Sequence, residues 1–172
     1  LSDNNVFYIL IDRKENVWIG TWGNGLNRYN PQTNSFTRYI HDPKKANSIA
    51  NFGIDCLLED SHGKLWIASE IDGLDHFDPE TGVFTHYKAG KKQGSISSNG
   101  VLSLFQDSKK RIWVGTTAGL NLFDSATQSF KVFRQKDGLP NDGIMGILEG
   151  SGGDLWLSTN KGLSRFNPEQ ES

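Results

Sequence analysis

The segment Trp18-Ile19-Gly20-Thr21, followed closely by Gly25-Leu26, is the first copy of a motif that recurs along this chain. Similar segments follow three times, and their tryptophans are separated by intervals of 48, 47 and 43 residues. The later copies are Trp66-Ile67-Ala68-Ser69, Trp113-Val114-Gly115-Thr116 and Trp156-Leu157-Ser158-Thr159. A unit of this length that recurs in register indicates a repeat architecture, in which each copy is one supersecondary unit.

Each repeat is interpreted as four short strands. An apolar run comes first and is expected to be buried on both faces, and an aspartate and a turn follow it. The tryptophan lies on the second strand, and a short loop closed by a glycine with positive φ leads to the third. The fourth strand has an aromatic residue at each end. The last repeat reaches Ser172 before a fourth strand can form, so the sequence predicts fifteen strands.

Four-stranded antiparallel units of this period, without helical periodicity, are typical of a β-propeller. The predicted fold class is therefore all-β, with about 3.75 blades that form one partial propeller over residues 1–172. The blades are expected at residues 6–39, 54–87, 101–133 and 144–168, the last without its outer strand.

The recurring tryptophans are expected to form the core. Burying about 200 Å² of indole contributes on the order of 5 kcal/mol before entropy is subtracted. The residue two positions after each tryptophan is small, which would let a neighbouring sheet approach closely. The predicted core tryptophans are Trp18, Trp66, Trp113 and Trp156.

The order of apolar strand, Asp, turn, Trp-Ile-Gly-Thr, Gly-Leu, aromatic residue and Asn/Asp-Pro resembles the two-component regulator propeller repeat. The closest matches are residues 107–123 and 12–31, and the resemblance covers essentially the whole chain. Ala68 and Ser158 depart from the pattern where it has glycine, and Gly150 departs where it has aspartate. The resemblance implies the periplasmic sensor region of a receptor anchored in the inner membrane, such as a hybrid histidine kinase or a diguanylate cyclase. Some members sense oligosaccharides.

Composition excludes several kinds of function. The net charge of −2 offers no basic surplus for a phosphate backbone, so no nucleic-acid partner is expected. Four histidines and one cysteine form no metal-ligand pattern, so no metal or cofactor is expected. The aspartates after the first strands could serve calcium binding or proton transfer, but one per repeat favours a role in the turn.

Ligands of propellers meet the loops between blades and the loops between second and third strands. Amides and carboxylates beside an exposed aromatic ring suit sugar hydroxyls. Trp22 stands out because the other repeats have Glu70, Thr117 and Asn160 at that position, although Trp22 could instead cover a neighbouring blade. Asn4 and Asp142 also lie between blades. The predicted ligand-binding residues are Trp22, Asn24, Asn51, Glu70, Asp72, Asn99, Asn141, Asn160 and Lys161.

Three functions remain open at this point. The first is a non-catalytic, ligand-sensing part of a transmembrane signalling receptor, with an oligosaccharide as its ligand. The second is a protein-interaction or dimerisation propeller without a small ligand. The third is a propeller enzyme of the streptogramin lyase kind, although no nucleophile or phosphate motif supports catalysis. A partial ring would expose apolar faces at its ends, so self-association is also expected.

Overall fold

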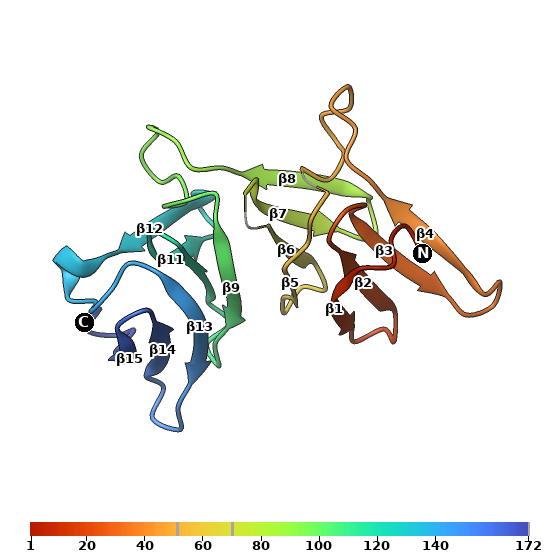
Figure 1. The fold of residues 1–172 in the computed structure, drawn as a ribbon. Coiled ribbons are helices and arrows are strands. Elements are labelled where there is room, and N and C mark those ends of the chain that lie inside the picture. Colours follow the sequence, from red (N-terminus) through yellow and green to blue (C-terminus); the bar gives the residue numbers. More distant parts are fainter. Residues whose placement is uncertain (51, 70, 172) are drawn as a thin grey trace. The chain divides into compact units, whose positions relative to one another are not determined.

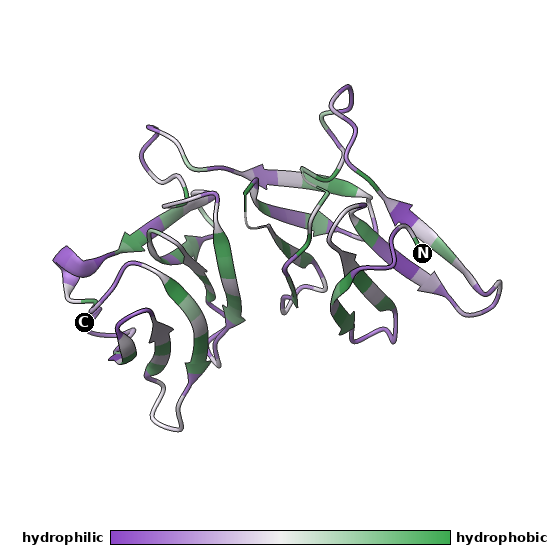
Figure 2. Ribbon diagram, in the orientation of Figure 1, coloured by the Kyte–Doolittle hydropathy of each residue, from purple (hydrophilic) through white to green (hydrophobic). Residues whose placement is uncertain are grey.

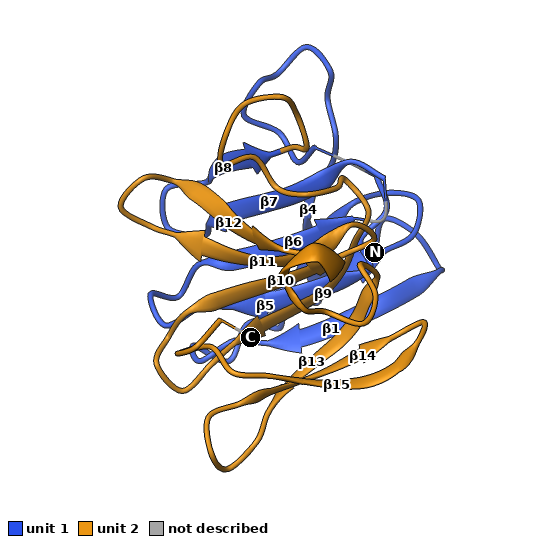
Figure 3. Ribbon diagram, turned by 90° about the vertical axis from the view of Figure 1, so that its left-hand side faces the viewer, with its two compact units in different colours: residues 1–87 blue, residues 88–172 orange. Residues whose placement is uncertain are grey.

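A computed structural model describes residues 1–50, 52–69 and 71–171, which form two compact units, Leu1–Tyr87 and Lys88–Ser172 (Figures 1 and 3). Each unit contains two antiparallel sheets. Apolar residues gather along the strands and polar residues in the connecting loops, as Figure 2 shows. The only helical element in the described residues is a 3-10 turn, η1 (Gln135–Asp137).

Unit 1 contains the first two blades, each with its four strands hydrogen-bonded in chain order. Blade 1 consists of β1 (Val6–Ile11), β2 (Val17–Thr21), β3 (Leu26–Asn30) and β4 (Ser35–Tyr39). Blade 2 consists of β5 (Cys56–Glu59), β6 (Leu65–Ser69), β7 (Gly73–Asp78) and β8 (Val83–Tyr87).

Unit 2 contains one four-stranded and one three-stranded sheet. Blade 3 consists of β9 (Val101–Gln106), β10 (Ile112–Thr116), β11 (Gly119–Asp124) and β12 (Ser129–Phe133). Blade 4 consists of β13 (Ile144–Glu149), β14 (Leu155–Thr159) and β15 (Gly162–Phe166). The predicted all-β class and the propeller-type blades are confirmed, and within the described residues the fourth blade has three strands.

Small residues on the second strand allow close contact between neighbouring blades. A Cβ added at Gly20 would lie 2.7 Å from Cγ2 of Ile54 in blade 2. In unit 2, a Cβ at Gly115 would lie 2.6 Å from the carbonyl oxygen of Ile144 in blade 4. Any larger side chain would therefore separate the sheets, because interiors are close-packed.

The tryptophans of blades 1 and 3 pack edge-on against a phenylalanine of the following blade. The rings of Trp18 and Phe77 are 5.9 Å apart at an angle of 79°, and those of Trp113 and Phe166 are 5.8 Å apart at 73°. The T-shaped arrangement is favourable because the positive edge of one ring meets the negative face of the other. Tryptophan to phenylalanine is thus the central contact between successive blades within each unit.

The aspartate after the first strand stabilises both the turn and the tryptophan. Asp12 accepts hydrogen bonds from the backbone N–H groups of Lys14 and Asn16, and its Oδ2 accepts one from Trp18 Nε1 at 2.8 Å. Asp60 and Asp107 accept the corresponding bonds from Trp66 Nε1 at 3.2 Å and Trp113 Nε1 at 2.9 Å. The three carboxylates are buried. They hold the polar edge of an otherwise apolar indole, which is a structural role.

Two sequence-based expectations were wrong. Trp156 does not lie in the core, since 40% of it is exposed while Trp18, Trp66 and Trp113 are buried. Strand β1 is not buried on both faces, because Phe7, Ile9 and Ile11 are exposed. The reason is the same in both cases: among the described residues of each unit, no blade covers that side of the sheet.

Candidate ligand-binding surface on the first blade

A β-bulge in the first strand places Phe7 outside the regular alternation of the sheet. Val6 pairs with Thr21 and Tyr8 with Gly20, so Phe7 has no partner on β2. Bulges re-aim a side chain and are frequent near functional sites. Here the bulge directs the phenyl ring onto Trp22, with the ring centroids 4.9 Å apart and the planes at 27°.

The loop after β2 fixes Trp22 beside this ring. The N–H of Trp22 donates to the carbonyl oxygen of Asn5 at 3.0 Å, and the Thr21 hydroxyl donates to the carbonyl oxygen of Gly25 at 2.9 Å. Gly25 has a φ of 75°, which glycine adopts without a steric cost, and its N–H donates to the carbonyl oxygen of Phe52 in blade 2 at 2.7 Å. Hydrogen bonds to the segment before β1 and to the residue Phe52 before β5 therefore fix the loop that carries the indole.

Polar groups border the aromatic stack. Asp3 accepts a hydrogen bond from Asn24 Nδ2 at 3.1 Å and another from the N–H of Asn5 at 2.7 Å. A Cβ at position 23 would lie 2.6 Å from Asp3 Oδ2, so Gly23 leaves room for the carboxylate. The result is a carboxylate and an amide at the edge of two stacked rings.

About half of this aromatic surface is open to solvent, since 57% of Phe7 and 48% of Trp22 are exposed. Large exposed aromatic residues beside directional polar groups are unusual on a folded domain and mark binding surfaces. An apolar ring face can accept the C–H face of a sugar, while the carboxylate and the amide bind its hydroxyls.

The structure brings some of the other predicted site residues together. In blade 4, Asn141 Oδ1 and Asn160 Nδ2 both lie within 3.4 Å of the position that a Cβ would take at Gly143. The neighbouring Lys161 is exposed on the same hairpin, and its N–H bonds to the Thr159 hydroxyl at 3.1 Å. This group belongs to unit 2, whereas Trp22 and Asn24 belong to unit 1.

Other predicted site residues serve the local backbone. Asn99 accepts a hydrogen bond from the N–H of Ala89 at 2.7 Å, and Asp142 accepts one from the N–H of Gln135 at 2.7 Å. Asn141 accepts one from the N–H of Gly143 at 2.9 Å, while Asn4 is exposed. Asn51 and Glu70 lie outside the described residues.

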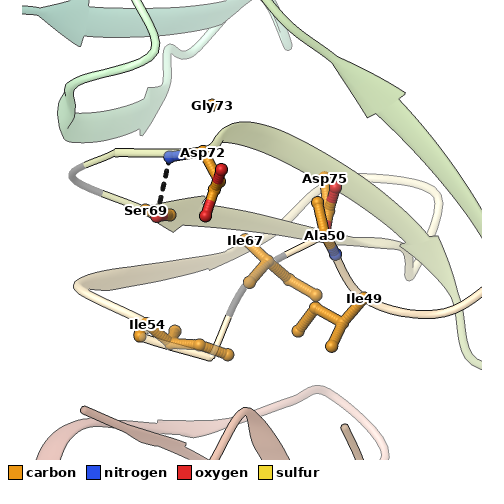
Figure 4. A pocket seen from close by; sticks show the side chains of 9 residues that line it. Ile49, Ala50, Ile54, Ile67, Ser69, Asp72, Gly73 and Asp75 are labelled. Atoms are coloured by element: carbon orange, nitrogen blue, oxygen red, sulfur yellow. Dashed lines mark hydrogen bonds between the residues drawn. The ribbon is translucent and has the colours of Figure 1, made fainter. Parts of the chain in front are cut away.

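The cavity beside Asp72 is too small for a ligand. It is lined by residues such as Ile49, Ile54, Ile67 and Asp75, and Figure 4 shows it next to the hydrogen bond from the N–H of Asp72 to the Ser69 hydroxyl. Its volume of about 10 Å³ corresponds to a single water molecule. Asp75 Oδ2 accepts the N–H of Ala50 there at 2.7 Å, which fastens the loop between blades 1 and 2.

Three of the four histidines have structural partners. His41 Nδ1 lies 2.8 Å from the carbonyl oxygen of Ile49, and His86 Nδ1 lies 2.6 Å from Asp75 Oδ1. His76 stacks on Trp66 and contacts Asp60 at 3.0 Å. Burial opposes ionisation of Asp60, but the hydrogen bonds from His76 and two backbone N–H groups outweigh it and lower the pKa of this carboxyl. Among the described residues, no three His, Cys, Asp or Glu side chains are grouped to hold a metal.

The sequence predicted Trp22 and Asn24 as ligand-binding residues, which stays a prediction, and it did not point to Phe7 and Asp3, which the structure places beside them. Phe7 is the only aromatic residue at its repeat position, where the other repeats have Asp55, Leu102 and Met145. The sequence shows this contrast, but it does not show the bulge that turns the Phe7 ring toward Trp22. Asp3 was missed because its contact with Asn24 depends on how the segment before β1 folds.

Blades of three or four antiparallel strands that pack tryptophan to phenylalanine define a β-propeller protein. The family model of the two component regulator propeller matches residues 1–23 and 95–118. These two segments are similar to the repeats of that family, in agreement with the resemblance seen in the sequence. A search of curated proteins found no match.

Solved structures share this fold. The extracellular domain of a protein from B. thetaiotaomicron assigned as a hybrid two component system matches all of this chain at 25% identity and a TM-score of 0.86. The extracellular domain of a second protein of this organism, assigned as a one component system, matches 96% at 24% identity with a TM-score of 0.76. This chain spans 23% and 22% of the lengths of these two proteins.

A streptogramin B lyase matches 98% of this chain at 17% identity with a TM-score of 0.71, and the match covers 53% of the lyase. At that identity the likeness concerns the fold alone. In the part of the chain that the structure describes, no helix has the length and apolar character needed to span a membrane.

Proposed function

We propose that this chain is the ligand-recognising part of the extracytoplasmic region of a two-component signalling receptor, and that it has no catalytic activity of its own. The support is the family match of two segments and the likeness to the extracellular domain of a hybrid two component system. In this proposal the receptor is anchored in the inner membrane and the propeller lies in the periplasm.

The proposed ligand is an oligosaccharide. The observation that carries this proposal is the exposed stack of Phe7 on Trp22 with Asp3 and Asn24 at its edge. Stacking on a preformed aromatic platform costs little entropy, because the bulge and the hydrogen-bonded loop already fix both rings. A platform of this kind selects ligands with an apolar face and hydroxyls around it, which is the chemistry of a sugar ring.

A non-catalytic role agrees with the contacts of the titratable groups. The buried aspartates Asp12, Asp60 and Asp107 each accept a tryptophan Nε1–H, and the histidines described above contact backbone carbonyls or aspartates. Groups engaged in this way stabilise turns and loops. At the exposed aromatic platform the Asp3 carboxylate accepts hydrogen bonds from Asn24 Nδ2 and from the N–H of Asn5, so it too is engaged in local contacts.

Calorimetric titration with short neutral and acidic oligosaccharides tests the proposal, after a thermal-shift screen selects the binders. Trp22→Ala should weaken binding of a selected sugar about tenfold or more, because the main stacking surface is lost. Thr117→Ala is the matched control, since Thr117 is the exposed residue at the same position in blade 3. Equal affinity of the wild type and the folded Trp22→Ala variant, or no binding across the panel, would contradict the proposal.

A further inference from the structure

A side chain on the third strand of each of the first three blades accepts the N–H of the segment that leads into that blade. In blade 2 this side chain is Asp75, whose Oδ2 accepts the N–H of Ala50 at 2.7 Å, and Figure 4 shows the two residues side by side. The counterparts are the bonds from the N–H of Ser2 to Asn27 Oδ1 at 3.0 Å and from the N–H of Ser97 to Asn121 Oδ1 at 2.9 Å. Blade 2 therefore has a carboxylate where blades 1 and 3 have a neutral amide.

The residue opposite this position on the outer strand also differs in blade 2. Asp75 pairs with His86, whereas the amides of blades 1 and 3 pair with Arg38 and Val132. The second carboxylate oxygen, Asp75 Oδ1, lies 2.6 Å from His86 Nδ1. An amide has N–H groups of its own, and Asn121 Nδ2 donates to three neighbouring oxygens. An ionised carboxylate can only accept, so in blade 2 the donor comes from the histidine of the outer strand.

The two contacts of His86 require a proton on each ring nitrogen. Its Nδ1 faces the Asp75 carboxylate, and its Nε2 lies 3.0 Å from the carbonyl oxygen of Ala46 in the β4–β5 loop. Both partners are acceptors, because an ionised carboxylate and a backbone carbonyl have no hydrogen to donate. A neutral imidazole has one N–H, whereas the imidazolium has two. Both hydrogen bonds are therefore formed in the charged state of the ring.

Loss of one proton from His86 should break its contact with the loop and not its contact with β7. The hydrogen bond to the carboxylate is the stronger of the two, because its acceptor is charged, so the neutral ring keeps the proton on Nδ1. A lone pair on Nε2 would then face the carbonyl oxygen of Ala46. The Asp75 carboxylate is buried, but 29% of the His86 side chain is exposed, so the ring can exchange protons with solvent.

The β4–β5 loop forms one wall of a groove within unit 1. Arg38 and Tyr39 of β4 and Phe84 of β8 line the groove together with loop residues, and its volume is about 410 Å³. Asn47 holds the loop at the edge of β8, since its Oδ1 accepts the N–H of Phe84 at 2.8 Å. The contact of His86 with Ala46 lies next to this bond in the chain, so it contributes to the position of the groove wall.

Other titratable and charged groups lie around the pair of Asp75 and His86. They are Asp72 beside the small cavity next to Asp75, Arg38 on β4, and His41, Asp42, Lys44 and Lys45 on the loop. Histidine is the side chain whose charge ordinarily changes between pH 5 and 8, so His41 is the group to distinguish from His86. The contact of His41 Nδ1 with the carbonyl oxygen of Ile49 needs one N–H, which a neutral ring also has. Titration of His41 therefore leaves its own hydrogen bond in place.

We propose that Asp75 and His86 form a pH-sensitive switch that controls the β4–β5 loop. With His86 charged, the loop is bound at both Ala46 and Ala50. With His86 neutral, the bond at Ala50 remains and the contact at Ala46 is lost. The folded state favours the charged ring, so the stability that this contact provides is present at low pH and is lost as the pH rises and the ring releases a proton. The proposal is independent of the ligand recognition proposed above.

Nuclear magnetic resonance of the nitrogen-15-labelled chain, recorded from acid to alkaline pH, tests the switch. Both ring nitrogens of His86 should carry a proton at low pH, and as the pH rises Nε2 should lose its proton while Nδ1 keeps its own. The backbone amide signals of Lys45, Ala46 and Asn47 should shift with the same midpoint as the ring. Loss of the Nδ1 proton instead, or loop signals that do not follow the His86 ring, would overturn the proposal.

A double variant that copies the neutral arrangement of blade 3 tests the cause. Asp75→Asn combined with His86→Val reproduces the pair of Asn121 and Val132, and the new amide oxygen can still accept the N–H of the loop. This variant should abolish the pH-dependent shift of the loop signals. His62→Gln is the matched control, since His62 is an exposed histidine on the β5–β6 turn, and it should leave the shift unchanged. A shift that persists in the double variant, or that disappears in His62→Gln, would overturn the proposal, and the titration of the wild type decides it even if the double variant does not fold.

Discussion

Blades 3 and 4 share one compact unit and one sequence motif, yet their tryptophans lie in different surroundings. Trp113 is buried, donates to Asp107 at 2.9 Å and packs on Phe166 of the next blade. Trp156 is exposed, and Gly150 stands where blade 3 has its aspartate. The acid of the blade 4 turn is Asp154 instead, which binds Arg165 at 2.5 Å and Asn167 at 2.8 Å.

The difference shows what makes the repeated tryptophan a core residue. The indole needs an apolar face from the next blade and an acceptor for its N–H, and blade 3 has both. In blade 4 the indole of Trp156 is exposed, and Gly150 stands at the position of the aspartate. Blade 4 also differs at a second hydrogen bond. In blade 3, Asn121 accepts the N–H of Ser97, whereas the equivalent residues of blade 4 are Ser164 and Pro140, and proline has no N–H.

Truncation of the two tryptophans should give the largest difference in stability loss between blades 3 and 4. Trp113→Ala is expected to lower the free energy of unfolding by about 3–5 kcal/mol, because it leaves a large cavity between blades 3 and 4. Trp156→Ala should cost about 1 kcal/mol or less, since its ring is partly solvated. Urea unfolding followed by circular dichroism at a concentration where the chain is monomeric measures both. Equal losses for the two variants would show that the exposed ring contributes as much as the buried one.

Removal of the acceptor should have the next largest effect. Asp107→Ala leaves the Nε1–H of Trp113 and the N–H of Arg111 without their acceptor, which should cost roughly 2–3 kcal/mol. Asp154→Ala, the comparison in blade 4, should cost only about 1 kcal/mol, because its partner Arg165 is largely exposed. The same urea unfolding experiment measures the loss of stability in each variant. If Asp154→Ala proved the more damaging, the tryptophan–aspartate pair would not be the main fastening of the turn.

Low pH should destabilise the blades in which an aspartate accepts the tryptophan N–H. Burial opposes ionisation of Asp12 and Asp107, but hydrogen bonds from Trp18 and Asn16, and from Trp113 and Arg111, outweigh it and lower the pKa of each carboxyl. The unfolded chain therefore binds more protons, so the free energy of unfolding should fall as pH drops through about 4 and below. Asp107→Asn should flatten this dependence in urea unfolding from neutral to acid pH. A slope unchanged by the substitution would count against the lowered pKa.

Restoring the aspartate in blade 4 should have the smallest effect. A Cβ at position 150 would lie 3.0 Å from Trp156 Nε1, and the exposed indole can move by the few tenths of an ångström required. Gly150→Asp should therefore change the stability by less than about 1 kcal/mol while slowing hydrogen exchange of the Trp156 N–H. Gly152→Asp is the control, because a Cβ there meets no atom within 4 Å. If Gly150→Asp and Gly152→Asp slowed exchange of the Trp156 N–H equally, the effect would come from the added charge and not from a hydrogen bond.

The sequence predicted the repeats, the strand order and the four-stranded blades, because tryptophan, glycine and the turn residues recur in register. It also singled out Trp22 from its contrast with the other repeats, and the role of Trp22 in binding remains a prediction. It could not place Phe7, because a bulge breaks the alternation that sequence reasoning assumes. It wrongly placed Trp156 in the core, because burial depends on a neighbouring blade and not on the motif itself.

The accessibility of the five tryptophans tests the account most directly. Fluorine NMR of the chain labelled with fluorotryptophan, assigned with single Trp→Phe variants, reports each indole's contact with a soluble paramagnetic probe. In the dilute monomer, Trp18, Trp66 and Trp113 should be protected, while Trp22 and Trp156 should be broadened by the probe. Protection of Trp156 in the monomer, or broadening of Trp113, would contradict the account.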